Sequence, residues 1–412
     1  MNRKKSLHIV IAGCGFSFPL GEALTSRVRL LASALDKNGA SVRVLHFNYS
    51  ERPPQINNLE TKGAYKGIDF EYTTGNTIRP SFFISRCWLQ IKGLLFGLWR
   101  LRQLSHHGQL DCLCLYGRRH RIIIPIIFIC RLLRVPVILD LCEWWPVFTN
   151  CSRREKAIFF KYILEKVSGV ITISEHIREK LKIIYGKKGI NMPILKVPIL
   201  VDSVEWQLPP SQSDDDSQKY VLWCGSLSGY PQTVKFLMRV MLELSNRKGE
   251  AKLKLVGAIT PFQIKQFRNY QRNLGLTEQR VEFVGYKRQE ELKQQFSAAT
   301  ALLVPVGNTE RELCGFHTKT GEYLASGCPI VTTNIGEPAN YFKNGVNAML
   351  CKPEDAKDFA HNIQLLLDSP QRAKAIGEAG QELAKTVFDY RIHGPRIINF
   401  IRQEIIVKKC SY

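Results

Sequence analysis

Short apolar runs alternate along the chain with stretches in which apolar residues recur at helical spacing. Residues 7–12 form an unbroken apolar run, and after a glycine-rich turn the helical spacing covers residues 24–35, before a second run at 41–47. This order predicts a strand, a helix and a parallel strand that is buried on both faces. The first half continues with predicted strands at 110–115, 135–141 and 170–174 and predicted helices at 122–133 and 153–167.

The alternation stops in a polar, acidic segment and then restarts. Residues 201–219 contain PPSQSDDDSQ, which offers little to bury and predicts a linker. We therefore predict two doubly wound α/β domains, residues 1–200 and 220–390, with ligands at the carboxyl ends of the strands. The second domain is predicted to hold strands at 220–224, 252–256, 281–284, 301–306 and 330–333 and helices at 234–245, 261–273, 289–298, 318–325 and 356–367.

Composition narrows the class of protein. The chain has 412 residues, of which 45% are hydrophobic and 23% charged, so it can bury two cores and is not disordered. Its 12 cysteines include no CxxC pair, which predicts free thiols in a reducing cytosol rather than a zinc site. The apolar run at 122–130 is too short to span a bilayer, and the basic, then apolar start predicts a first buried strand rather than a secretion signal.

The most specific stretch, residues 312–337, reads ELCGFHTKTGEYLASGCPIVTTNIGE. It resembles the motif of retaining glycosyltransferases of family four, which have the GT-B fold: two facing Rossmann-like, doubly wound domains with a cleft between them. The family's first motif Glu is Cys314 here, and the Gly after Phe is His317. The residues in register with the motif are Gly315, Phe316, Glu322, Ala325, Gly327, Pro329 and Ile330.

Further stretches follow in the family's order, among them VLWCGSLS, RVEFVGYKRQEELKQQF and GVITISEHIREKL. The resemblance implies an enzyme of polysaccharide biosynthesis that moves a sugar from a nucleotide diphosphate-sugar to a glycan or lipid-linked acceptor. It implies retention of anomeric configuration, no metal and no cofactor besides the donor. Residues 1–200 would be the acceptor side and residues 220–390 the nucleotide-sugar side, and a C-terminal helix, residues 391–412, would cross back to the first domain.

The resemblance also implies how the donor is held. Glu322, early in a predicted helix, would accept the ribose hydroxyls. Phosphates favour backbone N–H groups at helix starts together with a cation, and the family's usual cations are replaced by Ser226 and Pro231. Lys319 is the substitute, because it lies one turn before Glu322 on the same helix face. The remaining donor-binding candidates are Gly21, Gly225, Ser226, Gly315, Phe316, His317, Thr318 and Tyr286, of which Tyr286 either stacks on the base or packs locally.

The altered first motif position leaves the mechanism open. Cys314 carries no charge unless its pKa is strongly depressed, so Glu312 or Glu310 would supply the missing carboxylate. On the acceptor side Glu143 is the candidate general base, or else it pairs with Arg118 or Arg119. The alternative function is a catalytically impaired nucleotide-sugar-binding protein of the same fold.

The charge balance points to a partner. Lys and Arg number 58 against 36 Asp and Glu, which gives a net charge of +22. Residues 83–102 place Ile84, Trp88, Ile91, Leu95 and Leu98 on one helical face and Arg86, Lys92 and Arg100 opposite. This pattern fits either a peripheral helix on an anionic membrane or a core-facing helix with a solvated basic face. We expect a cytoplasmic protein, peripheral on the inner face of a membrane if the first interpretation holds, with the cations of residues 118–121, 131 and 134 adding to it.

Two other ligands are not expected. No helix-turn-helix, zinc finger, RNP or KH pattern is present, so nucleic acid is not a predicted partner. Gly13 and Gly15 follow the first predicted strand, as in dinucleotide-binding proteins, but the third glycine is misplaced and no acidic residue ends the second strand. NAD is therefore not an expected cofactor.

Overall fold

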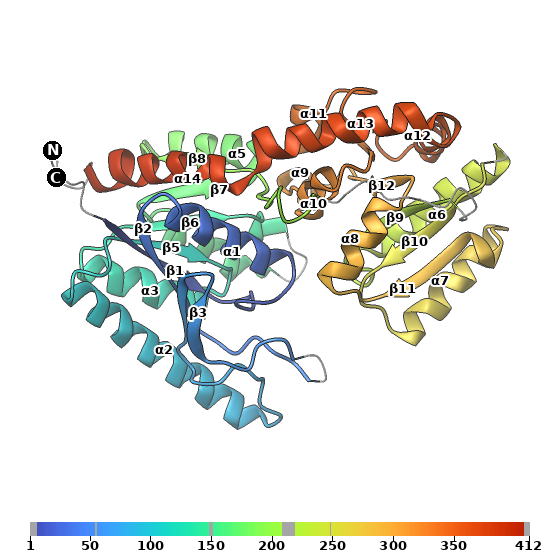
Figure 1. The fold of residues 1–412 in the computed structure, drawn as a ribbon. Coiled ribbons are helices and arrows are strands. Elements are labelled where there is room, and N and C mark those ends of the chain that lie inside the picture. Colours follow the sequence, from blue (N-terminus) through green and yellow to red (C-terminus); the bar gives the residue numbers. More distant parts are fainter. Residues whose placement is uncertain (1–5, 54–55, 148–150, 208–218, 248, 408–412) are drawn as a thin grey trace. The chain divides into compact units, whose positions relative to one another are not determined.

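The computed structural model describes residues 6–53, 56–147, 151–207, 219–247 and 249–407. The chain forms two compact units (Figure 1). Unit 1 consists of residues 1–200 together with 390–412, and unit 2 of residues 201–389.

Unit 1 is built on an eight-stranded sheet with the order β3-β4-β2-β1-β5-β6-β7-β8. All neighbours are parallel except β3 and β4, which form an antiparallel pair at one edge. The sequence places β1 in the centre because its residues are apolar on both faces. The strands are β1 (Leu7–Gly13), β2 (Ala40–His46), β3 (Lys62–Tyr65), β4 (Ile68–Tyr72), β5 (Cys112–Tyr116), β6 (Val137–Leu141), β7 (Gly169–Thr172) and β8 (Ile194–Lys196).

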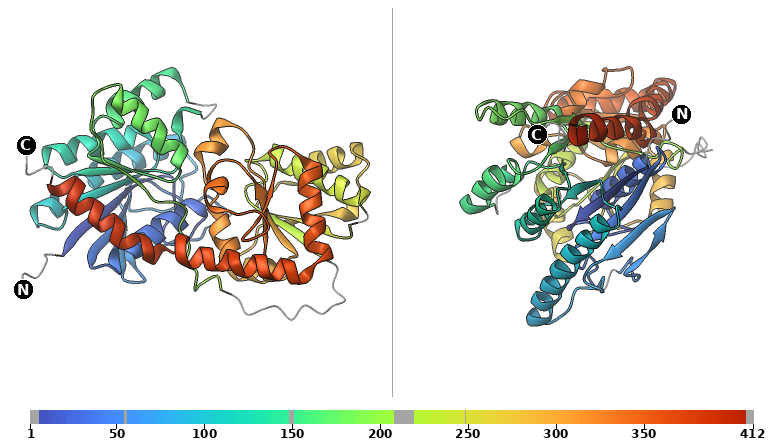
Figure 2. Two further views of the ribbon diagram at one scale, coloured as in Figure 1. Left: turned by 90° about the horizontal axis from the view of Figure 1, so that it is seen from above. Right: turned by 90° about the vertical axis from the view of Figure 1, so that its left-hand side faces the viewer.

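Helices cover the sheet of unit 1 on both faces (Figure 2). Alternate residues of β1, such as Ile9 and Ile11, pack with Val28 and Leu35 of the first helix and with Ile397 near the C-terminus in one core cluster. The helices are α1 (Ala23–Asp36), α2 (Phe83–His106), α3 (His120–Leu132), α4 (Arg153–Ile158) with its π-helical continuation Phe159–Ile163, α5 (Glu175–Gly186) and α14 (Tyr390–Asn399) with its continuation Phe400–Ile406.

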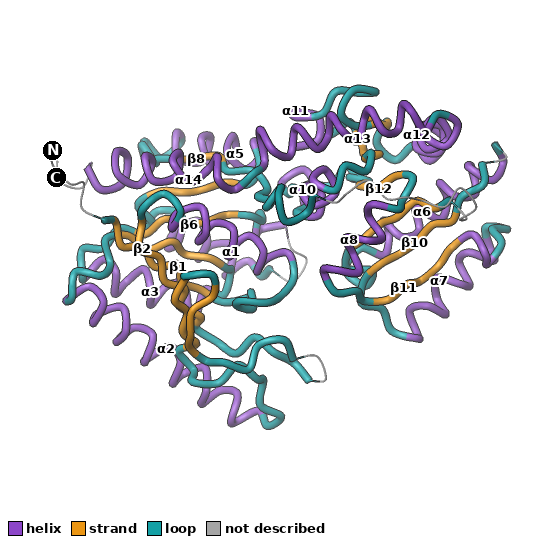
Figure 3. The backbone as a smooth tube through the Cα atoms, viewed as in Figure 1, coloured by secondary structure: helices purple, strands orange, loops and turns teal. Residues whose placement is uncertain are grey.

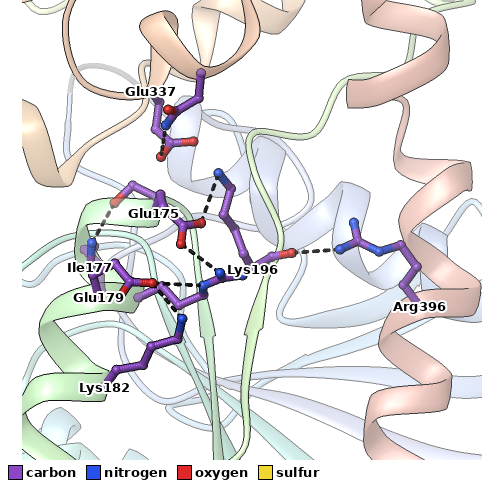
Figure 4. Close-up of polar contacts among 10 residues, drawn as sticks. Glu175, Ile177, Glu179, Lys182, Lys196, Glu337 and Arg396 are labelled. Atoms are coloured by element: carbon purple, nitrogen blue, oxygen red, sulfur yellow. Dashed lines mark hydrogen bonds and ion pairs between the residues drawn. The ribbon is translucent and has the colours of Figure 1, made fainter.

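The C-terminal helix α14 belongs to unit 1 and packs against α1. Gly394 makes the close approach possible, because a Cβ there would lie 2.3 Å from the carbonyl oxygen of Ala34. Arg396 donates a hydrogen bond to the carbonyl oxygen of Lys196 at 3.3 Å, and the Lys196 Nζ lies 3.6 Å from Glu175 Oε2 (Figure 4). These contacts join α14, β8 and α5 at the surface.

Unit 2 has a six-stranded parallel sheet with the order β11-β10-β9-β12-β13-β14. Its strands are also largely buried, with Val221 and Leu222 inaccessible on the two faces of the central strand. The strands are β9 (Tyr220–Cys224), β10 (Lys252–Val256), β11 (Val281–Gly285), β12 (Ala301–Val304), β13 (Ile330–Thr333) and β14 (Met349–Cys351).

Each strand of unit 2 is followed along the chain by one or two helices (Figure 3). One core cluster joins Val234, Phe267 and Phe359 of three helices to the strand residues Val221 and Leu253. The helices are α6 (Pro231–Asn246), α7 (Pro261–Asn273), α8 (Gln289–Ser297), α9 (Glu310–Cys314), α10 (Lys319–Ala325), α11 (Glu337–Tyr341), α12 (Ala356–Asp368) and α13 (Pro370–Leu383) with its π-helical continuation Ala384–Phe388.

The predicted fold class, two Rossmann-like doubly wound α/β domains, is confirmed. Part of the segment predicted as a linker is packed into unit 2: Ser203 donates a hydrogen bond from Oγ to Asp389 Oδ2 at 2.6 Å, and Trp206 is buried against Phe296. The rest of that segment, residues 208–218, lies outside the described residues.

Candidate functional site

The candidate site of unit 2 lies where the strand order reverses. The chain runs outward from β9 through β10 to β11, and then returns to place β12 on the other side of β9. In open parallel sheets, ligands bind beyond the carboxyl ends of the strands at this switch point. The turn after β9 and the segment after β12 therefore define the place to look.

The turn after β9 contains Gly225 and Ser226. The Gly225 N–H donates to the carbonyl oxygen of Val256 at 3.0 Å, and the exposed Ser226 side chain accepts from the Gly229 N–H at 3.1 Å. Gly257 is required beside this turn, since a Cβ there would lie 1.9 Å from the Gly225 carbonyl oxygen. The turn is thus shaped by backbone contacts.

Helix α10 brings the two charged candidates together. Lys319 begins the helix and Glu322 lies in its first turn, with Lys319 Nζ 2.5 Å from Glu322 Oε2. Glu322 is only 8% exposed, so the carboxylate is a buried partner of the lysine rather than a solvated side chain. Burial opposes the charge on Lys319, but the carboxylate of Glu322 outweighs it and raises the pKa of the ammonium.

Aromatic rings surround this ion pair. Lys319 Nζ lies 5.6 Å from the centroid of Trp206, close enough for a cation–π contact. Tyr323, the next residue after Glu322, accepts a hydrogen bond from the Cys224 N–H at 2.7 Å and so ties α10 to the end of β9. Tyr286, which directly follows β11, is 51% exposed and lies near enough to Lys319 to affect its pKa.

The segment before α10 is anchored by its aromatic residue. Phe316 is buried, with its ring stacked on Tyr341 at 5.7 Å and edge-on to Phe388 at 5.6 Å. The ring of His317 meets Tyr230 edge-on at 5.9 Å, and burial lowers the pKa of this histidine. The side chain of Phe316 therefore fixes the loop between α9 and α10, while donor binding by this residue stays a prediction.

The residues around the altered motif position form the short helix α9. Thr309 caps this helix: its Oγ1 accepts a hydrogen bond from the Glu312 N–H at 3.4 Å and donates one to Glu312 Oε2 at 2.9 Å. Cys314 is 1% exposed, and its thiol points toward Glu310 Oε1 at 3.9 Å. Both predicted substitutes for the missing carboxylate thus lie within one turn of Cys314.

The switch point of unit 1 lies between β1 and β5. Here two loops touch through their backbones: a Cβ on Gly13 would lie 1.8 Å from the Tyr116 carbonyl oxygen, and one on Gly117 would lie 2.2 Å from that of Cys14. Both glycines have positive φ, which only glycine adopts readily. The two loops are consequently fixed against each other.

Polar side chains in the interior hold the loop between β1 and α1. Both ring nitrogens of His46 face carbonyl oxygens, Nδ1 that of Asn48 at 2.5 Å and Nε2 that of Phe16 at 2.6 Å, and Nδ1 also lies 3.2 Å from the Asn48 backbone nitrogen. Burial lowers the pKa of His46 to about 4, so the ring is neutral at pH 7. Tyr72 and Asn58 similarly bond both backbone groups of one loop residue each, Phe18 and Leu20.

Gly21 and Glu143 are the two candidates in unit 1. Gly21 lies two residues before α1, where a Cβ would come within 2.4 Å of Thr25 Oγ1, the hydroxyl that binds both backbone groups of Ser17. Glu143 follows β6 and is partly buried, and among the described residues it makes no ion pair with Arg118 or with Arg119. The structural alternative for Glu143 is therefore not observed.

Three contacts were not anticipated from the sequence. They are the contact of Trp206 with Lys319, the hydrogen bond of Tyr323 to the end of β9, and the pairing of Glu312 with the cap residue Thr309. Of these three, only the pairing of Thr309 with Glu312 could be expected from the sequence, because the spacing Thr-x-x-Glu is typical of a capping box at the start of a helix.

The two Rossmann-like sheets define the fold of the chain: it has the GT-B fold. Residues 218–369 match the family described as "Glycosyl transferases group 1". An uncharacterised glycosyltransferase of Methanocaldococcus jannaschii is 24% identical over 211 residues, which cover 48% of this chain and 50% of that protein. The chain thus matches about half the length of this curated relative.

Solved structures with the same fold cover nearly the whole chain. Sucrose-phosphate synthase of Thermosynechococcus elongatus superposes with a TM-score of 0.71 at 16% identity, covering 96% of this chain and 98% of that one. HepE of Anabaena, in complex with UDP and glucose, gives 0.67 at 17% identity over 96% and 100%. WaaG, a glycosyltransferase involved in lipopolysaccharide biosynthesis, gives 0.59 at 16% identity over 95% and 100%. The domain match and the fold together support a GT-B glycosyltransferase.

Proposed function

We propose that the chain moves a sugar from a nucleotide diphosphate-sugar to a glycan or lipid-linked acceptor, with retention of anomeric configuration and without a metal. The observation that carries this proposal is the Lys319–Glu322 pair in the first turn of α10, beside the end of β9 and the switch point of unit 2. A buried carboxylate and a cation at this place match the two polar parts of such a donor, its ribose and its diphosphate.

In the proposed complex each member of the pair takes a different part of the donor. Glu322 accepts hydrogen bonds from the ribose hydroxyls, and Lys319 turns toward the diphosphate, whose negative charge replaces that of the carboxylate as its partner. In the turn after β9, Ser226 contributes its backbone N–H, because the Gly225 N–H already donates to Val256, and Tyr286 offers an exposed ring to the base. Gly315, His317 and Thr318 would line the sugar.

The proposed reaction exchanges one bond to the anomeric carbon for another. The bond to the diphosphate oxygen breaks as the acceptor oxygen bonds on the same face, and the acceptor's proton passes to the departing phosphate oxygen or to Glu143. Lys319 stabilises the charge that grows on the diphosphate, which lowers the barrier because this charge is larger in the transition state than in the bound donor. Glu312 supplies negative charge near the sugar once it leaves Thr309.

A second candidate function is a protein of the same fold that binds the donor but no longer transfers it. Cys314 favours this candidate, because it stands where the related enzymes carry a carboxylate and its side chain is buried. The absence of a cation at Ser226 and Pro231 points the same way. Turnover separates the two functions, whereas donor binding does not.

The proposal is tested by screening UDP-, GDP- and ADP-sugars for thermal stabilisation of the full chain, followed by transfer assays with free and lipid-linked glycans. We expect stabilisation by one nucleotide class and transfer of its sugar. Lys319→Met should then lower kcat more than donor affinity, with Lys293→Met on α8 as a control for losing a paired lysine.

Two outcomes contradict the proposal. If no nucleotide sugar stabilises the chain, the site is not a donor site. If a donor binds but no acceptor receives its sugar, and Cys314→Glu restores slow transfer, the second candidate function is correct.

We also propose that the chain works in the cytoplasm, at the inner face of a membrane. Its support is that none of the eleven described cysteines forms a disulfide, together with the basic character of unit 1.

A further inference from the structure

Helix α2 presents a long apolar face that the protein itself does not cover. The helix packs onto unit 1 through Gly93, Gly97, Leu101 and Leu104, which are its buried residues. The contact is close, since a Cβ on Gly97 would lie 2.3 Å from the ring of Phe47. The opposite side of the helix carries large apolar side chains that are all highly exposed: Ile84 81%, Trp88 66%, Ile91 54%, Leu95 62% and Trp99 49%.

These five residues, the α2 apolar face, follow one another at intervals of three or four residues. They therefore form a single stripe along the helix. Soluble monomers rarely leave so continuous an apolar surface in water, which marks it as a contact site. Of the two interpretations of residues 83–102, the core-facing helix is wrong, because the side that faces the core is the one lined by glycine and by Leu101 and Leu104.

The surroundings of this face are strongly basic. Residues 73–139 contain one acidic residue, Asp111, whose Oδ2 accepts a hydrogen bond from the His8 N–H. On α2, Arg100 is paired with Glu71 at 3.0 Å, while Lys92 and Arg102 are exposed. The same segment holds the lysine and arginines at positions 79, 86, 92, 100, 102, 118, 119, 121, 131 and 134.

The neighbouring helix extends this character. Helix α3 packs beside α2, contains no acidic residue, and exposes Phe128 and Leu132 at 64% each together with Arg131 (Figure 1). Among the described residues, no helix is both long and apolar enough to cross a membrane. Aromatic and aliphatic side chains flanked by cations are instead typical of a helix that lies flat in the headgroup region.

We propose that the α2 apolar face is a docking surface for an anionic lipid bilayer. Trp88, Ile91 and Leu95 enter the boundary between headgroups and acyl chains, and Lys92 and Arg102 contact the anionic headgroups. Charge complementarity selects this partner, because the segment offers cations and almost no carboxylates to whatever covers it. Docking requires neither donor nor acceptor, so it is tested separately from the proposed enzymatic function.

The first experiment is co-sedimentation of the full chain with vesicles. We expect binding to phosphatidylcholine vesicles that contain about 30 mol% phosphatidylglycerol, little binding to phosphatidylcholine alone, and weaker binding as salt rises. Leu95→Glu should weaken binding by at least about tenfold, since it removes an inserted side chain and adds a repelled charge. Leu59→Glu, at another exposed leucine of unit 1 (73% exposed), is the matched control and should bind like the wild type.

The second experiment uses the protein's own tryptophans. Of the six, Trp88 and Trp99 are on this face, whereas Trp144, Trp145, Trp206 and Trp223 are each less than a tenth exposed. Vesicles with brominated acyl chains should therefore quench and blue-shift the emission of Trp88 and Trp99 alone. The variant Trp88→Phe/Trp99→Phe should still sediment with vesicles but lose most of the quenching.

Two results would contradict docking of α2 on a membrane, and a third would identify another partner. Absence of binding to anionic vesicles, or unchanged binding of Leu95→Glu, overturns the proposal. If light scattering instead shows a wild-type dimer that Leu95→Glu converts to a monomer, without any vesicle binding, the face is covered by a second copy of this chain. Thermal unfolding of each variant shows whether it folds, and donor titration stays independent of these results.

Discussion

The two switch points of the molecule share a topology and differ in what they display. In unit 2 the candidate side chains lie at the ends of β9 and β11: a lysine paired with a buried glutamate, an exposed tyrosine and an exposed serine. In unit 1 the polar side chains point inward and hold the backbone of the loop after β1. The comparison teaches that the same topology can leave polar side chains accessible at one switch point and use them to hold the backbone at the other.

A buried ion pair also holds the backbone of unit 1. Arg27 of α1 donates from Nε and Nη2 to the two carboxylate oxygens of Asp140, at 2.9 Å each, and also reaches the carbonyl oxygens of Val197 and Pro198. Both side chains are almost fully buried. Burial alone would lower the pKa of Arg27, but the carboxylate of Asp140 raises it, so the guanidinium stays charged.

The largest effect is expected from breaking this pair. Asp140→Asn leaves the buried guanidinium of Arg27 without a counter-charge and should lower the free energy of unfolding by about 3–5 kcal/mol. Chemical denaturation followed by circular dichroism measures the change. Arg43→Met breaks an exposed pair of the same unit, Arg43 to Asp69 at 2.9 Å, and should cost less than about 1 kcal/mol. Equal losses in the two variants would mean that unit 1 does not depend on its buried polar groups.

The second largest effect is expected at the candidate donor site of unit 2. Glu322→Gln keeps the shape of the side chain but removes the charge that accepts hydrogen bonds from the ribose, and should weaken donor binding by about 1.5–3 kcal/mol. Calorimetric titration with UDP-, GDP- and ADP-sugars measures this loss. Glu290→Gln removes a carboxylate from another lysine pair of unit 2, at 2.9 Å on α8, and should leave the affinity unchanged. Wild-type affinity in Glu322→Gln would remove this residue from the proposed site.

The alternating fold was predictable because its strands are apolar on both faces. Strands β9 and β10 have the predicted bounds, and α7 does as well, since proline at its start and the asparagine at its end mark its limits. Strand β3 was not predicted, because Lys62 to Tyr65 is exposed along most of its length and lacks an apolar pattern. Helices α9 and α11 have five residues each, too few to show a helical period.

The candidate site was predictable only where local spacing fixes contact. Lys319 and Glu322 are three residues apart on a helix, and the structure shows them in contact. Trp206 belongs to an acidic segment, and its contact with Lys319 joins residues more than a hundred positions apart, which no local pattern encodes. The burial of Phe316 against Tyr341 and Phe388 is also a long-range property.

The smallest effect is a dependence on pH that belongs to unit 1. The pKa of His46 is about 4 in the folded protein because burial disfavours its charged form, and it returns to an ordinary value of about 6.5 on unfolding. Between these values the unfolded chain binds more protons, so stability rises with pH there and is lost as pH falls. From pH 7 to pH 5.5 this one group should remove about 1 kcal/mol from the free energy of unfolding. His46→Gln should lose that part of the slope, whereas His361→Gln, at an exposed position of unit 2, should keep it. An unchanged slope in His46→Gln would show that the ring is not held neutral, and the loop after β1 would then depend on its other polar contacts for its shape.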